Sequence, residues 1–372
     1  MIMNKTKVGI IGCGGIANGK HLPALKKLAA KGLIEIVAFC DLIEERAVKA
    51  AKEYGTEDAK VYTDYKELLK DNTIEAIHVC TPNRSHSFIT VDALHAGKNV
   101  ICEKPMAINS AEARKMVEAA QETGKLLTIG YQNRQTPEVQ YIKKTCDAGD
   151  LGDIYYAKAH AIRRRAVPTW GVFLNEYEQG GGPLIDIGTH ALDITLWTMN
   201  NYKPKMVVGS VYHKLADKLE NGSGNAWGDW DPKEFTVEDS AFGYIVMENG
   251  ATIVLESAWA LNSLDVIEAS TTLCGDKAGA DMRSADGKRG GVRINGVKHG
   301  KQYVEIPAMG AGGVDFYDGT AIKPADVEQE IFYSAIRNGT PLCVLPEQAF
   351  VVTQILEAIY ESAKTGKPVY FD

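Results

Sequence analysis

The sequence lacks an excess of positive charge and a long apolar run. Its 41 lysines and arginines face 48 acidic residues, and the net charge of −7 argues against a nucleic-acid binder. No apolar stretch approaches the roughly 18 residues that a membrane span needs. The N-terminal apolar stretch is too short for the core of a signal peptide and runs into a glycine loop, so we expect a cytoplasmic protein without a membrane partner.

Cysteine and histidine are too few and too scattered for a disulfide framework or a metal site. The 7 cysteines are odd in number and contain no C-x-x-C pair, and the 8 histidines include no H-E-x-x-H motif. We therefore predict no metal. The 372 residues, of which 45% are apolar and 24% charged, have the composition of a globular protein with two domains of roughly 150 residues or more.

Short apolar runs alternate with helical patterns through the first 130 residues. The runs are rich in Val and Ile, which is typical of strands buried on both faces. They span residues 7–11, 34–40, 60–62, 76–80, 99–102 and 126–129. Helical patterns between most of them end at glycines. This alternation predicts an α/β domain over residues 1–130, a doubly wound parallel sheet that binds a dinucleotide.

The pattern changes after residue 130. Strands are predicted at 154–161, 206–212, 240–247, 252–260 and 266–274, with a hairpin turn at 248–250. We expect residues 131–372 to form an α+β domain with a mostly antiparallel sheet, whose final helix and tail could pack back on the first domain. Residues 216–239 and 275–300 have the composition of loops. In the first of these, Trp227 and Trp230 are suited to stacking on a sugar or packing on another subunit.

A G-x-G-x-x-A motif directly follows the first predicted strand and opens the first predicted helix. Gly12 permits the tight turn, Gly14 lets a pyrophosphate approach the backbone, and Ala17 lets helix and strand pack closely. The phosphates would bind the exposed N–H groups at the helix start. The predicted cofactor-binding residues here are Gly12, Cys13, Gly14, Gly15, Ile16 and Ala17.

Asp41 ends the second predicted strand. A carboxylate there can accept hydrogen bonds from the adenosine ribose hydroxyls, and it would repel a 2′-phosphate. Leu42 and Ile43 supply no cation for such a phosphate, so NAD is favoured. Arg46 could reach in from the next helix, which leaves NADP open.

Two further strand ends carry polar residues on the same sheet edge, where ligands of open α/β folds bind. One reads Thr81-Pro82-Asn83 with His86 following, and the other reads Glu103-Lys104-Pro105. A Lys–Pro step holds the lysine backbone extended, which could aim the ammonium of Lys104 at a nicotinamide. We therefore add Thr81, Pro82, Asn83, His86, Glu103 and Lys104 to the cofactor site. The alternative for the Glu–Lys pair is a solvated loop.

Asp186 and His190 are spaced to share one helix face within the predicted helix 183–199. Asp193 lies one turn further and could orient the His190 ring. A carboxylate beside an imidazole makes a proton-transfer pair. The alternative is a polar stripe packed under another helix.

These residues together resemble the Gfo/Idh/MocA family of glucose–fructose oxidoreductases and inositol dehydrogenases, over nearly the whole chain. The shared features are the glycine loop, Thr81-Pro82-Asn83 with His86, Glu103-Lys104-Pro105, Gly130-Tyr131 with Arg134, the helix with Asp186, His190 and Asp193, and the stretch 359–366. The resemblance implies a Rossmann domain and a C-terminal domain with a large open sheet, which often forms the interface of a homodimer or homotetramer. It also implies Lys104, Asp186 and His190 as catalytic residues.

The predicted reaction is a reversible hydride transfer between NAD and a secondary hydroxyl of a sugar, sugar derivative or inositol. Candidate substrate-binding residues, besides Asp186 and His190, are Asn133, Arg134, Arg163, Trp170 and Tyr177. The alternatives are a redox-neutral glycosidase that uses NAD catalytically and an enzyme that oxidises an intact glycoside at C3. A non-enzymatic sugar sensor is disfavoured because the catalytic trio is retained.

Overall fold

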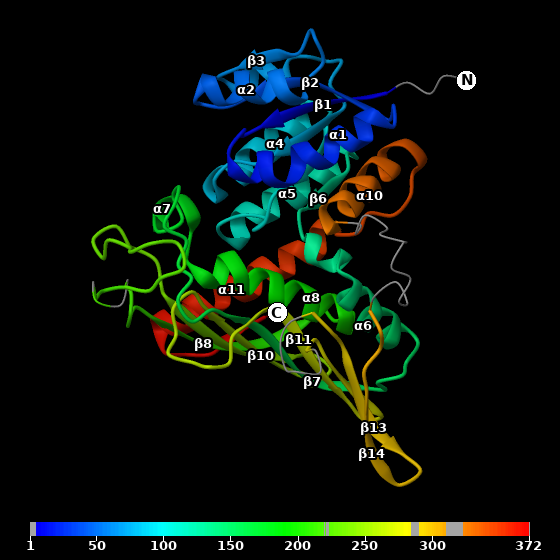
Figure 1. The fold of residues 1–372 in the computed structure, drawn as a ribbon, viewed down its shortest axis with the longest axis vertical. Helices are drawn as coiled ribbons and strands as arrows, with labels where there is room; N and C mark the ends of the chain where they lie inside the picture. Colours follow the sequence, from blue (N-terminus) through cyan, green and yellow to red (C-terminus); the bar gives the residue numbers. More distant parts are fainter. Residues whose placement is uncertain (1–4, 219, 221–222, 284–289, 310–322, 372) are drawn as a thin grey trace. The chain divides into compact units, whose positions relative to one another are not determined.

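In a computed structural model the chain forms two compact units, which we describe separately. The structure describes residues 5–218, 220, 223–283, 290–309 and 323–371 (Figure 1). The first unit comprises Met1–Gln132 and Ile322–Phe350, and the second comprises Asn133–Ala321 and Val351–Asp372. Helix α10 (Pro324–Asn338), which the sequence placed in the second domain, packs on the first helix of the first unit instead.

The first unit contains a six-stranded sheet in the order β3-β2-β1-β4-β5-β6, and every neighbouring pair is parallel. This is the predicted doubly wound arrangement, with its switch point between β1 and β4. The strands are β1 (Thr6–Ile11), β2 (Ile34–Cys40), β3 (Lys60–Tyr62), β4 (Ala76–Val79), β5 (Asn99–Cys102) and β6 (Leu127–Ile129).

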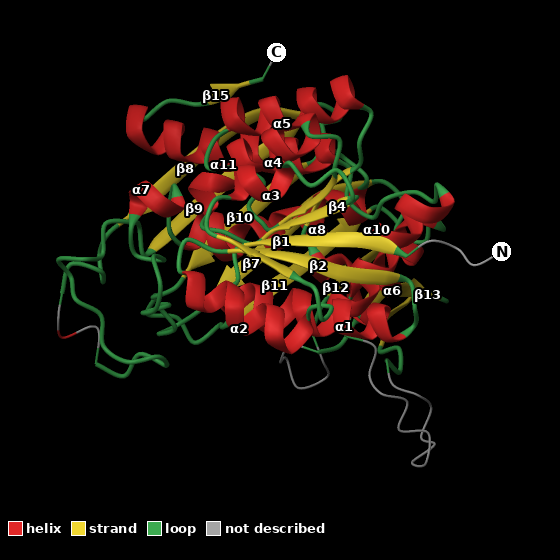
Figure 2. Cartoon of the chain, turned by 90° about the horizontal axis from the view of Figure 1, so that it is seen from above, coloured by secondary structure: helices red, strands yellow, loops and turns green. Residues whose placement is uncertain are grey.

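Helices cover both faces of this sheet, which explains why its strands are apolar without alternation. Figure 2 shows α1 and α2 on one side of β1 and β2, and α4 and α5 on the other. The core beneath α1 contains Val8, Ile10 and Leu25, joined by Phe332 and Tyr333 of α10. The helices are α1 (Leu22–Ala30), α2 (Glu44–Tyr54), α3 (Tyr65–Leu69), α4 (His86–His95) and α5 (Ser110–Thr123).

The second unit contains a nine-stranded sheet in the order β14-β13-β12-β11-β7-β10-β9-β8-β15. Its pairs are antiparallel except for β7 with β10, so the predicted mostly antiparallel sheet is confirmed. The strands are β7 (Ile154–Ile162), β8 (Pro204–Tyr212), β9 (Ser240–Met247), β10 (Thr252–Ala258), β11 (Ile267–Gly275), β12 (Ala278–Asp281), β13 (Arg293–Lys298), β14 (Lys301–Glu305) and β15 (Val369–Tyr370).

The prediction of a loop at 275–300 is wrong for two stretches, because β12 and β13 lie within it. Both belong to the outer part of the sheet, and β13 joins β14 through a turn at His299 and Gly300, which have positive φ angles of 52° and 73°. β12 contains only Ala, Gly and Asp, and three of the six residues of β13 are exposed, so neither strand has the apolar run that predicts a strand.

Helices α8 (Thr189–Met199) and α11 (Pro346–Thr365) lie on one face of this sheet (Figure 1). Glycines on the strands let α11 approach closely, since a Cβ atom at Gly209 or Gly243 would lie within 2.7 Å of the Ile359 side chain. Further helices that the structure describes in this unit include α6 (Pro137–Asp147) and the short α7 (Glu176–Gln179). Among the described residues, no helix has the length and apolar character for crossing a membrane.

Candidate active site

The glycine loop after β1 fits a dinucleotide pyrophosphate. Gly12 has a φ angle of 91°, and a Cβ atom there would lie 2.6 Å from the carbonyl oxygen of Cys80. Gly14 and Gly15, by contrast, have no atom within 4 Å of the corresponding position, so the space above their backbone is open. Asn18 holds the turn by donating from Nδ2 to the carbonyl oxygens of Cys13 and Gly14, both at 2.8 Å. The backbone of the loop is therefore accessible, which a phosphate site at this loop would require.

The apolar pattern of residues 16–30 is typical of one regular helix, but the helix after the glycine loop is irregular. It begins as a π-helical turn, η1 (Ala17–His21), and continues as α1. Ile16 remains 41% exposed, whereas Ala17 is completely buried and packs in the core that includes β1. The turn also buries Lys20 and His21, which face into the unit.

Asp41 supports the glycine loop directly. Its Oδ2 accepts a hydrogen bond from the backbone N–H of Cys13 at 2.8 Å, and its Oδ1 accepts one from Ile43 at 2.9 Å. A carboxylate has about four lone-pair positions, so two remain for ribose hydroxyls. Beside Asp41, Leu42 is 92% exposed and offers only an apolar side chain. Burial, followed by the charge of Asp41, raises the pKa of the Cys13 thiol to about 12, which makes Cys13 an inert neighbour.

The His86 side chain is buried and contacts the backbone of two loops. It is 1% exposed, and its two ring nitrogens contact the carbonyl oxygens of Pro105 at 2.7 Å and Thr81 at 2.8 Å. Burial lowers the pKa of the imidazole, although both carbonyls favour its protonated form. His86 thus ties the loop after β4, with Thr81, Pro82 and Asn83, to the cis Lys104–Pro105 peptide after β5.

Glu103 is also buried, and it anchors a chain of hydrogen bonds. Its Oε1 accepts from Lys20 Nζ and His21 Nε2, each at 2.6 Å. His21 Nδ1 lies 2.8 Å from Nδ1 of His78, whose Nε2 lies 2.7 Å from the Tyr333 hydroxyl. Each hydrogen bond in this series has one donor and one acceptor when both imidazoles are neutral. Tyr333 then donates to His78, His78 donates to His21, and His21 donates to the Glu103 carboxylate.

The charges in this network favour an ionised Glu103. Burial alone would raise the pKa of the Glu103 carboxyl, but Lys20 and His21 hold it well below its ordinary value. Burial also lowers the pKa of His78, which keeps that ring neutral. Lys20 contacts a second carboxylate, Glu328 of α10, at 3.0 Å, and there burial raises the pKa. The Lys20 ammonium therefore pairs with two carboxyl groups, and the carboxyl of Glu103 is the more acidic of the two.

This network fixes the backbone of Lys104. The second oxygen of Glu103 accepts from the Lys104 N–H at 3.3 Å, while the Lys104 side chain is half-buried. Gly130 leaves room for the ion pair, because a Cβ atom there would lie 2.9 Å from Glu103 Oε1 and 3.0 Å from Lys20 Nζ. Glu103 and His86, both predicted to bind cofactor, thus act in the structure as supports of residues that are more exposed.

In the second unit, Asp186 lies in a π-helical turn, η4 (Leu184–Gly188), that leads directly into α8. Glu238 caps the start of this turn: its two oxygens accept from the backbone N–H groups of Gly182 at 2.8 Å and Leu184 at 3.0 Å. Tyr360 donates its hydroxyl to the same carboxylate at 2.8 Å. The glycine cluster before η4 is required because a side chain at Gly182 would collide with the backbone of Glu238.

Trp259 orients the Asp186 carboxylate. The indole Nε1, on a completely buried side chain, donates to Asp186 Oδ2 at 3.0 Å. His190 lies in the first turn of α8 and is half-buried. The π-helical turn was not predicted, and it makes the spacing of Asp186 and His190 differ from that of a regular helix.

The sequence suggested that Asp193 orients the His190 ring, but Asp193 pairs with Arg134 instead. Arg134 donates to it from Nη2 at 2.6 Å and from Nε at 3.0 Å, and both side chains are at most 1% exposed. The guanidinium also lies 5.4 Å from the Trp197 ring and 3.3 Å from the Tyr202 hydroxyl. A bidentate pair is a stronger contact for a buried carboxylate than an imidazole, so Arg134 stabilises the base of α8.

The other substrate candidates differ in exposure. Arg163 makes a bidentate contact with Glu268, from Nε and Nη2, each at 2.7 Å. Trp170 is 50% exposed and Tyr177 on α7 is 63% exposed, whereas Asn133 is half-buried. Burial would lower the pKa of Arg163, but Glu268 and then the charge of Asp186 raise it above its ordinary value. The guanidinium of Arg163 thus interacts electrostatically with the Asp186 carboxylate.

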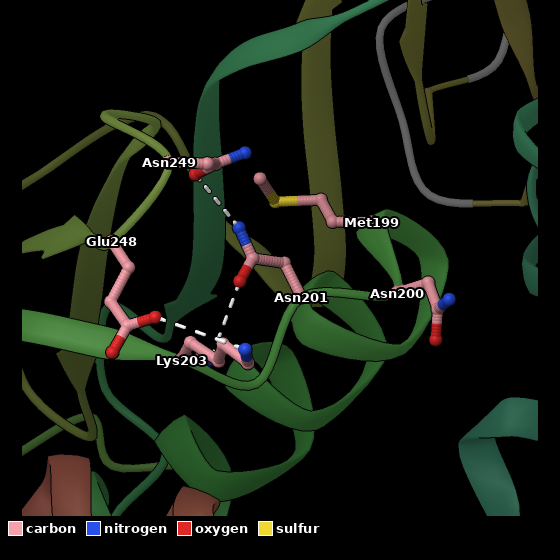
Figure 3. Close-up of a pocket in the computed structure, with 6 residues that line it drawn as sticks. All are labelled: Met199, Asn200, Asn201, Lys203, Glu248 and Asn249. Carbon is pink, nitrogen blue, oxygen red and sulfur yellow. Dashed lines mark hydrogen bonds and ion pairs between the residues drawn. The ribbon is translucent and has the colours of Figure 1, made fainter.

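A polar hollow of about 480 Å³ lies elsewhere in the second unit (Figure 3). It is lined by residues after the C-terminal end of α8 and by the β9–β10 turn, and Asn201 bridges these two parts by donating to Asn249 at 3.0 Å. Asp186 and His190 lie at the opposite, N-terminal end of α8, which is about 16 Å long. The hollow is therefore separate from Asp186 and His190.

Sequence reasoning missed several supporting residues: Lys20, His21, His78, Glu238, Trp259 and Glu268. Each acts on a residue far away in the sequence, so no local motif reveals it. Two signals were available, because Lys20 and His21 lie within four residues of the glycine motif and Trp259 directly follows β10. Among the described residues, no group of histidines, cysteines and acidic residues could hold a metal ion.

Comparisons with known proteins agree with this architecture. Residues 6–131 match the oxidoreductase family with an NAD-binding Rossmann fold, and residues 143–371 match its C-terminal alpha/beta domain. The chain is 33% identical to a D-glucoside 3-dehydrogenase of Escherichia coli over 369 residues, which cover 99% of this chain and 98% of the relative.

Two other proteins are similar over different extents. An inositol 2-dehydrogenase of Salmonella typhimurium is 33% identical over 199 residues, which cover 53% of this chain and 56% of the relative. The solved structure of levoglucosan dehydrogenase, in complex with NADH and levoglucosan, superposes with a TM-score of 0.81 at 20% identity and covers 99% of each chain. The chain belongs to the Gfo/Idh/MocA family of NAD-dependent sugar oxidoreductases, which act on CH–OH groups.

Proposed function

We propose that this protein oxidises the C3 hydroxyl of an intact glycoside to a ketone, with NAD as the hydride acceptor. The observation that carries the proposal is the extent of the similarity. The match to the D-glucoside 3-dehydrogenase spans 369 residues, whereas the match to the inositol 2-dehydrogenase spans 199. The similarity to a glucoside enzyme therefore extends through the unit that contains Asp186, His190 and Trp259.

Asp41 and its neighbours support NAD over NADP. The two free lone-pair positions of Asp41 suit ribose hydroxyls, and a 2′-phosphate there would face a negative charge with only Leu42 and Ile43 alongside. The loop at Gly12, Gly14 and Gly15 would hold the pyrophosphate. Bound NAD supplies the hydride acceptor, and the protein handles the hydroxyl proton and the developing charge.

Lys104, Asp186 and His190 are the proposed catalytic residues. The C3–H bond breaks and its hydride leaves the carbon. At the same time the hydroxyl oxygen gives its proton to His190, and the electron pair of the O–H bond forms the C=O bond. Lys104 donates a hydrogen bond to that oxygen and stabilises its negative charge. Asp186, held by the Trp259 indole, binds an adjacent hydroxyl and fixes the ring. The reverse reaction uses the same groups.

A spectrophotometric screen tests the proposal. The protein is mixed with NAD, and separately with NADP, against glucosides, free aldoses, sugar acids and inositols, and the absorbance of the reduced nicotinamide is followed. We expect the fastest reduction with a glucoside and NAD, and a 3-keto-glucoside by mass spectrometry and NMR. Faster turnover of an inositol, or cleavage of the glycoside without net NADH, would overturn the proposal.

We also propose that the protein assembles as a homodimer or homotetramer through the outer face of its large sheet. Opposite the face covered by α8, Val208, Tyr212 and Tyr244 are between 38% and 48% exposed and lie on adjacent strands β8 and β9. An exposed apolar patch of this kind is typical of an interface. Light scattering should give a multiple of the 40.5 kDa chain mass, and Tyr244→Lys should reduce it; a wild-type monomer would contradict the assembly.

A further inference from the structure

Two exposed tryptophans meet edge to face on the second unit. The rings of Trp170 and Trp227 have centroids 4.9 Å apart and planes at 89°. The two residues are 50% and 44% exposed, although tryptophan side chains are usually buried. The second tryptophan of the same segment behaves differently: Trp230 is 2% exposed and donates from Nε1 to the carbonyl oxygen of Ala216 at 3.1 Å. Among the tryptophans of the chain, only Trp170 and Trp227 are thus highly exposed.

The loop that carries Trp227 is fixed in place. The Asn225 side chain accepts from the Val167 N–H at 2.8 Å and donates to the Val167 and Gly228 carbonyl oxygens at 3.0 and 2.7 Å. Thr169 donates its hydroxyl to the Trp227 carbonyl oxygen. These bonds join the two loop segments on either side of the ring pair, so the rings are presented in a fixed arrangement.

Aromatic contacts lead from this pair to Asp186. Trp170 contacts Phe173, with centroids 5.7 Å apart, and Phe173 contacts Trp259 at 6.4 Å. Trp259 donates its indole N–H to Asp186. One further aromatic ring, Phe173, therefore separates the exposed pair from the tryptophan that orients the candidate catalytic carboxylate.

Arg163 gives the pair a polar border. Its guanidinium lies 5.3 Å from the Trp227 ring centroid and is held by Glu268. Glu268 lies at an irregularity of β11, where the register with β7 shifts between Ile267 and Ser270 and Ala269 has a φ angle of 50°. Bulges of this kind often lie next to active sites, where they redirect a side chain, and a positive φ at alanine is costly.

We propose that Trp170 and Trp227, bordered by Arg163, form a subsite for the second ring of a glycoside, the aglycone, while the first ring is oxidised beside Asp186. The inference rests on the proposed function and adds a specificity to it. A sugar or aryl ring has an apolar face that can lie on an indole, and the hydroxyls or substituents at its edge can bond Arg163. The subsite therefore favours glycosides with a ring as aglycone over methyl glycosides and free hexoses.

Steady-state kinetics of the full-length protein with NAD test this specificity. Methyl glucoside, phenyl glucoside and a glucose disaccharide share the reacting ring and differ in the aglycone. We expect Trp227→Ala to raise the KM for the phenyl glucoside, the disaccharide or both by about 3- to 10-fold. The KM for methyl glucoside and the kcat for all three should stay within twofold. The two ring-bearing substrates distinguish an aromatic aglycone from a second sugar.

Two variants control this experiment. Trp227→Phe keeps a ring and should restore most of the affinity, and Tyr155→Ala removes a different aromatic side chain that is 57% exposed and should change nothing. An equal rise in KM for all three substrates would contradict the subsite, because it would indicate an effect on the reacting ring. Unchanged KM values in the Trp227→Ala and Trp170→Ala variants would contradict it as well.

A binding measurement separates this inference from the proposed function. Phenyl glucoside is titrated against the protein by calorimetry and by quenching of tryptophan fluorescence, with no turnover required. Binding that weakens in Trp227→Ala supports the subsite even if no glycoside is oxidised, in which case only the proposed function fails. Binding of equal strength in wild type and Trp227→Ala, or none in either, overturns the subsite even if glucosides are oxidised.

Discussion

The candidate residues of the two units are held in opposite ways. In the first unit Lys104 is fixed by a buried, charged network in which Glu103, Lys20 and His21 are all paired. In the second unit Asp186 is held by an indole, and the side chains around it extend to exposed tryptophans on loops. A cofactor is the same in every turnover and suits a rigid, motif-encoded site, whereas a sugar substrate varies among relatives and suits a site built from loops.

Both units nevertheless use one shared device. The helix after the glycine loop and the helix that carries His190 each begin with a five-residue π-helical turn, η1 and η4. Such turns are rare and frequently lie at functional sites, because they redirect side chains relative to a regular helix. Here η1 buries Lys20 and His21 beside Glu103, and η4 contains Asp186.

Removing a proposed catalytic group from each unit should have the largest effect. We expect Lys104→Ala and His190→Ala each to lower kcat by about 10²- to 10⁴-fold, because general acid–base help and stabilisation of the oxygen are lost. NAD affinity, measured by calorimetry, should change little in either variant. Turnover at the wild-type rate in the double variant would show that these residues are not catalytic.

The buried ion pairs of Lys20 should stabilise the first unit much more than an exposed ion pair does. Lys20→Met leaves Glu103 and Glu328 without their shared cation, and we expect it to lower the free energy of unfolding by about 3–5 kcal/mol. Lys31→Met is the matched control, because Lys31 pairs with Glu330 of the same helix α10 at an exposed position. Its expected cost is about 0–1 kcal/mol. Equal costs in urea denaturation would contradict the assigned network.

Glu103 also gives this unit a pH dependence. Its pKa lies below the ordinary value of 4.5 in the folded protein, so its stabilising contribution is complete above pH 4.5 and is lost as the pH falls through the lowered folded value. The stability difference between wild type and Glu103→Gln should therefore be largest near neutral pH and shrink in acid. A difference that stays constant from pH 7 to pH 3 would show that Glu103 is not ionised.

The smallest expected effect concerns the choice of cofactor. Asp41→Asn keeps the size of the side chain and removes the charge that opposes a 2′-phosphate. We expect the Kd for NAD to rise roughly 10-fold, as when a hydrogen bond to a charged group is lost, and the Kd for NADP to fall. If the NAD-to-NADP ratio does not move, Asp41 serves only the glycine loop through Cys13.

The sequence predicted the first unit better than the second, for physical reasons. A glycine such as Gly12 is required by backbone geometry, and that requirement is visible locally. Exposed and buried tryptophans are indistinguishable in a sequence, so Trp227 and Trp230 were treated alike although only Trp230 is buried. Long-range partners were also invisible, as when Asp193 pairs with Arg134 and Trp259 with Asp186.

The same limit explains which predicted roles changed. Chemistry can be read from a motif, but the direction of a side chain cannot, so Glu103 and His86 were expected to contact the cofactor, whereas both side chains are buried in the first unit. Strands β12 and β13 were missed because β12 is short and made of small residues and Asp, and β13 contains Arg, Asn, Gly and Lys, so both have the composition of loops. Elements with two buried faces, such as β1 and β4, were predicted nearly to their ends.

Isotope transfer tests the proposed reaction most directly. Methyl glucoside carrying deuterium at C3 is incubated with the protein and NAD, and the reduced cofactor is isolated and examined by mass spectrometry and NMR. We predict that the deuterium appears in the reduced nicotinamide and that the sugar becomes a 3-keto-glucoside. Reduced cofactor without deuterium, or a cleaved glycoside with no reduced cofactor, would contradict the proposal.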